Sequence, residues 1–92
     1  MITIDTNVVV RYLAKDDLQQ TLEATELLSV NDCMILQTVL IEVIWVLSSK
    51  MGLNWMREMV VERVRHILSL PTIWVQEPEN VYKALSWYES GM

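Results

Sequence analysis

The sequence predicts one α/β domain with a parallel sheet, and three observations support this fold class. Short apolar runs that could form buried strands recur at residues 2–5, 33–36 and 72–76. The stretches between them repeat apolar residues every three or four positions, which is the spacing of amphipathic helices. No repeat, low-complexity tract or linker divides the 92 residues. Strands that alternate with helices form parallel sheets covered by helices.

The expected order of elements is β-α-α-β-α-α-β-α, with helices at residues 7–15, 18–30, 38–51, 54–70 and 79–90. Thr38 and Asn54 can cap the third and fourth helices, and Gly52 is well placed to end the third. The second helix is expected to present an apolar stripe of Leu18, Leu22, Thr25 and Leu28. The fourth helix is expected to present Met56, Val60, Val64, Ile67 and Leu68.

The composition predicts a soluble cytoplasmic protein. Just over half of the residues are apolar, and a single cysteine, Cys33, excludes an intrachain disulfide and fits a reducing compartment. Asp5 interrupts the N-terminal apolar run, so no signal peptide is expected. The longest nearly apolar stretch, residues 39–47, is too short to cross a membrane. The net charge of −5 counts against simple electrostatic capture of nucleic acid.

The first candidate site is the polar corner Asp5-Thr6-Asn7, which follows the first strand. Ligands of open parallel sheets bind in the crevice beyond the carboxyl ends of the strands, where Asp5 is expected to lie. A helix cap is the simplest role for Asp at such a corner. Thr6 and Asn7 could serve as caps equally well, so the acid also suggests a cation site.

Glu42 is the second candidate, because it is the only polar residue between Val39 and Leu47, and its apolar neighbours suggest a buried carboxylate that needs a partner. Helical spacing places it on one face with Thr38 and Trp45. One alternative is a salt bridge to Arg11, to Lys15 or to an arginine of the fourth helix. The other is an approach to Asp5 from the helix that follows the second strand. Two carboxylates brought together repel each other unless a cation lies between them.

Oxygen ligands without a Cys and His cluster favour Mg²⁺ or Mn²⁺, which can activate water for attack on a phosphodiester. His66 is expected to be solvated and Cys33 to be buried. The two glycines cannot build a nucleotide-binding loop. An aspartyl-phosphate enzyme would need an acid where Asn7 stands. Arg11 and Lys15 form either a solvated face or a phosphate contact, and the four tryptophans are expected in the core and at interfaces.

The segments Asp5-Thr-Asn-Val-Val-Val-Arg-Tyr-Leu13 and Ile41-Glu-Val-Ile-Trp-Val-Leu47, in this order of elements, resemble the PIN domain family. The likeness is closest to the VapC-type toxins of toxin–antitoxin modules. It implies a three-layer PIN-like fold and a ribonuclease that hydrolyses RNA with Mg²⁺ or Mn²⁺. It also implies a homodimer and an inhibitory antitoxin protein. Asp5 and Glu42 match catalytic metal ligands, and Thr6, Asn7 and Thr38 match supporting residues.

The resemblance also leads us to expect an incomplete domain over residues 1–92. The family carries further acids in an Asp-x-x-Asp segment after a glycine that corresponds to Gly91, and its last strands follow. Either a longer native protein or another chain would supply these acids. We therefore expect the 92 residues alone to be weakly active or inactive. The alternative function is an inactive PIN remnant that dimerises or binds an antitoxin.

Overall fold

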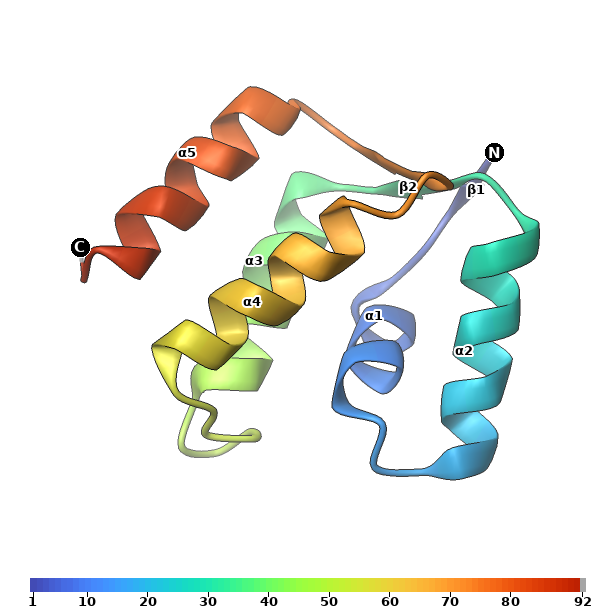
Figure 1. The fold of residues 1–92 in the computed structure, drawn as a ribbon, viewed down its shortest axis with the longest axis horizontal. Helices are drawn as coiled ribbons and strands as arrows, with labels where there is room; N and C mark the ends of the chain where they lie inside the picture. Colours follow the sequence, from blue (N-terminus) through green and yellow to red (C-terminus); the bar gives the residue numbers. More distant parts are fainter. Residues whose placement is uncertain (92) are drawn as a thin grey trace.

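The computed structural model describes residues 1–91, and Met92, with which the expected domain ends, lies outside this range. Within residues 1–91 the order of elements is the expected one, and the α/β class is confirmed (Figure 1). The strands are β1 (Ile2–Thr3), β2 (Cys33–Ile35) and β3 (Ile73–Val75). The helices are α1 (Thr6–Ala14), α2 (Leu18–Val30), α3 (Gln37–Ser48), α4 (Arg57–Leu68) and α5 (Pro78–Glu89).

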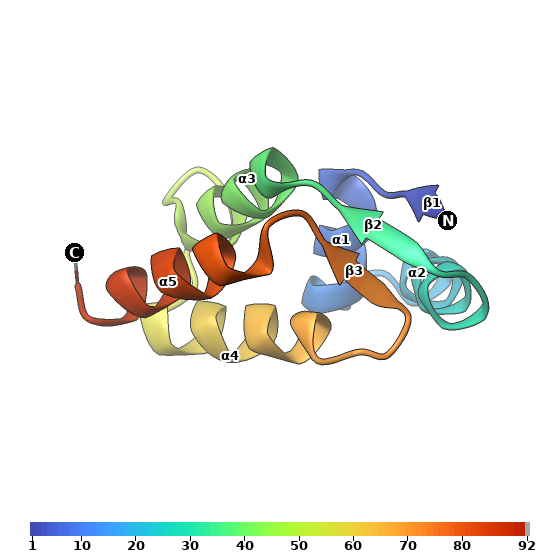
Figure 2. The same ribbon diagram turned by 90° about the horizontal axis from the view of Figure 1, so that it is seen from above.

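The strands form a small parallel sheet in the order β1-β2-β3, as far as the described chain extends. Ile2 is paired with Cys33, and Met34 is paired with Trp74. In Figure 2 the strands lie side by side, and α3 and α5 begin from the same end of the sheet. Because the strands are parallel, α1 also begins at this end. The polar corner after β1 and the start of α3 are therefore brought to one rim of the sheet.

Packing between neighbouring helices completes the core. Helix α1 packs against both α2 and α3, α3 packs against α4, and α4 packs against α5. The buried cluster takes residues from every helix and from all strands of the described sheet except β1, which is followed by the buried Ile4. Val9, Val43 and Ile67 are fully buried members from α1, α3 and α4. The contact between α1 and α3 is the one that positions the candidate site.

The expected caps of α3 and α4 are wrong. Helix α3 begins at Gln37 after an N-cap residue, Leu36, that makes no side-chain hydrogen bond, so Thr38 lies inside the helix. Helix α4 begins at Arg57, and Asn54 instead adopts a left-handed backbone with φ 52°. The reason is that the segment between these helices folds back on the end of α3. The backbone N–H of Asn54 donates to the carbonyl oxygen of Ser49.

Gly52 lies in this returning segment and not at the helix end itself, since α3 stops at Ser48. Its backbone approaches α3 so closely that an added Cβ would stand 2.1 Å from the carbonyl oxygen of Val46. A side chain at this position would overlap the backbone of the helix. The glycine is thus required by a close approach between two backbone segments.

The apolar stripe expected on α2 is also wrong in part. Leu28 is buried, but Leu18 and Leu22 are 76% and 56% exposed. The other buried residue of α2 is Ala24, one turn before Leu28. Helix α2 packs mainly against α1, so only a narrow stripe is covered. On α4 the expected stripe is buried except for Met56, which lies before the helix and is exposed.

The tryptophans, which were expected in the core and at interfaces, lie mostly outside the core. Trp45, Trp74 and Trp87 are each more than half exposed, and Trp55 is packed in part against the core. Their surface positions leave large apolar groups on α3, β3 and α5. Among residues 1–91, no helix combines the length and the apolar character needed to cross a membrane.

Candidate functional site

Asp5 lies between β1 and α1 and caps the helix. Its Oδ1 accepts a hydrogen bond of 3.0 Å from the backbone N–H of Val8. The extended backbone of Asp5, with φ −97° and ψ 175°, is typical of an N-cap residue. The capping role is therefore confirmed. It engages only one oxygen of an exposed carboxylate, so it does not exclude a second role.

Glu42 is exposed on α3 and is not a buried acid, contrary to what its apolar neighbours suggested. Its Oε2 accepts a hydrogen bond of 2.9 Å from Oγ1 of Thr6. The alternative of a salt bridge from Glu42 is not found within residues 1–91, where the one ion pair joins Arg65 to Glu89. Helix α3 tolerates the acid because its face containing Ile41, Glu42 and Trp45 is open to solvent.

The hydrogen bond between Thr6 and Glu42 joins two parts of the chain that are 36 positions apart. Since Thr6 follows Asp5 directly, the contact brings Glu42 to the polar corner that begins α1. Both carboxylates keep one oxygen, Oδ2 of Asp5 and Oε1 of Glu42, that makes no hydrogen bond within the described chain. Two exposed carboxylate oxygens at one corner fit the donor set of a hard divalent cation.

No group of three or more His, Cys, Asp or Glu side chains gathers as a metal site within residues 1–91. Mg²⁺ is usually held by one or two carboxylates and completes its octahedral shell with water and substrate phosphate. The residues present therefore fit a Mg²⁺ or Mn²⁺ ion that is shared with water and substrate. They do not fit Zn²⁺, which prefers a closed set of nitrogen and sulfur ligands.

The other candidate residues lie at different distances from this corner. Asn7 is exposed in the first turn of α1, and Thr38 is exposed one turn before Glu42 on α3. Arg11 is exposed further along α1. Lys15 is the C-cap residue of α1, and its Nζ lies 5.7 Å from the ring centre of Tyr12. Asp5 and Lys15 thus mark opposite ends of α1, and the structure does not bring them together.

Sequence reasoning missed a contact between Tyr12 and His66. The Tyr12 hydroxyl lies 2.8 Å from Nε2 of His66, and the two rings are stacked. His66 was expected to be solvated, and it is exposed, but it has this specific partner on α1. No local signal could have revealed the contact, because the residues are 54 positions apart.

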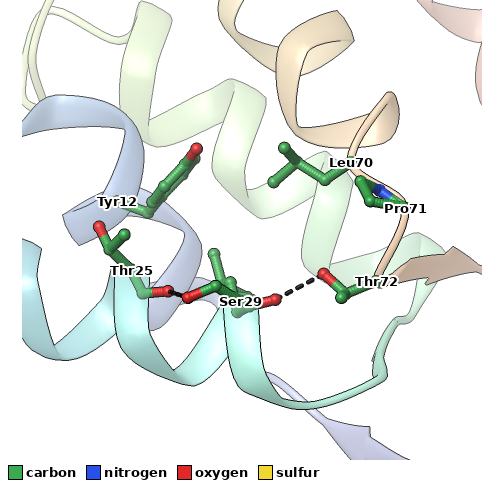
Figure 3. A pocket seen from close by; sticks show the side chains of 7 residues that line it. Tyr12, Thr25, Ser29, Leu70, Pro71 and Thr72 are labelled. Carbon is green, nitrogen blue, oxygen red and sulfur yellow. Dashed lines mark hydrogen bonds between the residues drawn. The ribbon is translucent and has the colours of Figure 1, made fainter.

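A cavity of about 170 Å³ lies beside Tyr12, between α2 and the segment that enters β3 (Figure 3). Its polar groups are occupied, because the hydroxyl of Ser29 donates to the carbonyl oxygen of Thr25, and that of Thr72 to Leu28. The remaining lining is mostly apolar, including Leu70 and Pro71. The cavity has no group poised for chemistry.

An apolar groove of about 160 Å³ separates α3 from α5. It is lined by Gln37, Leu40, Ile41, Ile44, Asn80, Val81 and Ala84. Ile41 is 65% exposed here, and Trp45 follows one turn later on the same helix. The groove is therefore continuous with the open face that carries Glu42.

Cys33 offers no nucleophile, as the sequence predicted. The side chain is fully buried in β2, and this burial raises the pKa of the thiol, with a smaller contribution from the charge of Asp32. A thiol with a raised pKa is a poor source of thiolate at neutral pH.

Comparison of the chain with models of protein families, with curated proteins and with solved structures gave no significant match.

Proposed function

We propose that the chain is a metal-dependent endoribonuclease of the PIN family and the toxin of a toxin–antitoxin module. The observation that carries the proposal is the hydrogen bond from Thr6 to Glu42. It joins the Asp5 corner to the second acid that the family resemblance names. A three-layer PIN-like arrangement of the helices and the sheet belongs to the same proposal.

In this proposal Asp5 and Glu42 would hold the cation, each through the oxygen that makes no hydrogen bond. Bound Mg²⁺ or Mn²⁺ would polarise the scissile phosphate and orient water for in-line attack. Asp5 keeps its orientation because the Val8 N–H holds the other oxygen. Asn7 and Thr38 are exposed near the two acids and would be available as supporting polar groups. Arg11 is the better placed of the two candidate phosphate contacts, because Lys15 lies at the far end of α1.

The net charge of −5 disfavours the binding of RNA, which is also negatively charged. An acidic surface repels phosphate, and long-range attraction therefore cannot supply the binding free energy. A divalent cation would neutralise the two negative charges of Asp5 and Glu42 and could bind a phosphate oxygen directly, so RNA would be held at the site of chemistry. We further propose that the protein acts in the cytoplasm as a homodimer that an antitoxin protein inhibits.

The test is a titration with Mn²⁺ followed by an RNA cleavage assay with Mg²⁺. Wild-type protein is expected to bind Mn²⁺, and Asp5→Asn and Glu42→Gln are each expected to abolish binding. Cleavage by the 92-residue chain is expected to be slow and to be lost in both variants. Glu26→Gln, which changes an exposed acid on α2, is the matched control and should bind Mn²⁺ as wild type does. Mn²⁺ binding that survives both site variants would overturn the proposal.

A second candidate function is a binding module without activity, which dimerises or holds an antitoxin. The observation that favours it is the apolar groove between α3 and α5 with the exposed Ile41 and Trp45 beside it. Ile41→Ser is then expected to weaken self-association in analytical ultracentrifugation without lowering the melting temperature. Leu18→Ser, at an exposed leucine on α2, is the control. Self-association without Mn²⁺ binding would favour this second function over the first.

A further inference from the structure

The Thr6 hydroxyl has an unusual hydrogen-bond partner for a residue in the first turn of a helix. At such positions a hydroxyl commonly bonds to the backbone nearby. Here Asp5 already accepts from the Val8 N–H and caps α1, so the Thr6 hydroxyl is not needed for this purpose. It donates instead to Glu42 on the neighbouring helix, at 2.9 Å.

This hydrogen bond restrains the side chain of Glu42, which has no other hydrogen bond in the described part of the chain. A glutamate on an open helix face has several rotamers of similar energy, and a bound ligand must select one of them. The Thr6 side chain is short and has few rotamers in a helix, so its hydroxyl has few possible positions. The hydroxyl therefore selects one orientation of the Glu42 carboxylate before any cation arrives.

We propose that Thr6 is a positioning residue for Glu42, and that it prepares this carboxylate to bind the cation through Oε1. The inference rests on the proposed function, because it concerns the same site. It differs from the family expectation, in which Thr6 supports the first acid, Asp5. Groups that orient metal ligands from outside the coordination shell typically contribute a factor of about 10 to 100 to metal affinity.

The test compares three threonine variants by titration with Mn²⁺, with free Mn²⁺ measured by electron paramagnetic resonance. Thr6→Val keeps the shape and removes the hydroxyl, and we expect it to weaken binding by about tenfold. Thr6→Ser keeps the hydroxyl and should restore binding to within about twofold of wild type. Thr25→Val is the matched control, because that hydroxyl bonds only to the backbone of α2. It should leave binding unchanged.

A metal-free measurement separates this inference from the proposed function. NMR couplings across the Glu42 side chain should report one dominant rotamer in wild type and in Thr6→Ser, and averaged rotamers in Thr6→Val. Averaged couplings in wild type would overturn the inference, whatever the metal does. Wild-type Mn²⁺ affinity in Thr6→Val would overturn it as well, while binding that depends on Asp5 and Glu42 would leave the proposed function standing. A wild-type protein that binds no Mn²⁺ would overturn both.

Discussion

The hydroxyl of Tyr12 and Nε2 of His66 lie 2.8 Å apart and join α1 to α4. Their rings are inclined by only 7°, with centroids 5.8 Å apart, so the two side chains lie flat beside each other. Helices α1 and α4 both pack against α3. The pair therefore adds a direct polar link between helices at the two sides of α3.

Removal of this hydroxyl should destabilise the fold slightly. Tyr12→Phe keeps the ring and loses the hydrogen bond to His66, so we expect the free energy of unfolding to fall by about 0.5–1.5 kcal/mol. Urea denaturation followed by circular dichroism measures this change. Tyr82→Phe is the control, because that tyrosine is exposed on α5 and makes no hydrogen bond within residues 1–91. Equal stability of the two variants would show that the link between the helices contributes nothing.

Two substitutions of Asp5 should separate its capping role from its charge. Asn caps helices as well as Asp does, so Asp5→Asn should keep the stability and lose the affinity for Mn²⁺. Asp5→Ala removes both functions, and its free energy of unfolding should be lower by about 0.5–2 kcal/mol. Thermal melts and Mn²⁺ titrations of both variants provide the comparison. If Asp5→Asn bound Mn²⁺ normally, Asp5 would be a helix cap and nothing more.

The sequence predicted the order of the elements because each depends on local apolar spacing. The strand that contains Cys33 and the buried stripe of Val60, Val64 and Ile67 were found in this way. The candidate corner at Asp5 could also be located, since a polar triplet directly follows a strand. These features depend on residues that are close together in the chain.

The predictions are wrong where contacts between segments distant in the sequence determine the local structure. Asn54 fails to cap α4 because its segment folds back on α3, and Leu22 is exposed because only α1 covers α2. The apolar neighbours of Glu42 suggest that it is buried, but the sequence does not reveal which face of a nearly apolar helix is left open. The Thr6 partner of Glu42 could not be predicted for the same reason.

Cys33 should make the stability of the protein depend on pH in the alkaline range. Burial, and to a lesser degree the charge of Asp32, raise the pKa of the thiol above its ordinary value of 9.0 in the folded state. The unfolded chain therefore loses this proton first as the pH rises. The stabilisation is fully present below pH 9.0 and is lost as the pH rises from there through the raised folded value.

Cys33→Ala removes this titration and supplies the comparison. The difference in the free energy of unfolding between the two proteins should be constant from about pH 6 to pH 8. Above pH 9.0 the wild type should lose stability faster, by at most about 1.4 kcal/mol per pH unit. Urea denaturation at a series of pH values measures both curves. Parallel curves up to pH 11 would mean that the thiol ionises equally well in the folded protein.

A methyl group at position 52 should destabilise the protein, because the segment after α3 approaches the helix too closely to admit one. In Gly52→Ala the new Cβ would stand 2.1 Å from the carbonyl oxygen of Val46, so two backbone segments must move apart. We expect the free energy of unfolding to fall by about 1–3 kcal/mol, as for other overpacked sites.

Gly91→Ala is the control. Gly91 has φ +93°, which strains any other residue, but its added Cβ would meet only a flexible arginine side chain, at 3.4 Å. Thermal melts should therefore show a larger loss for the first variant, with its backbone overlap, than for the second, which carries backbone strain alone. Similar losses would mean that backbone strain, and not the contact with Val46, determines the effect of a methyl group at position 52.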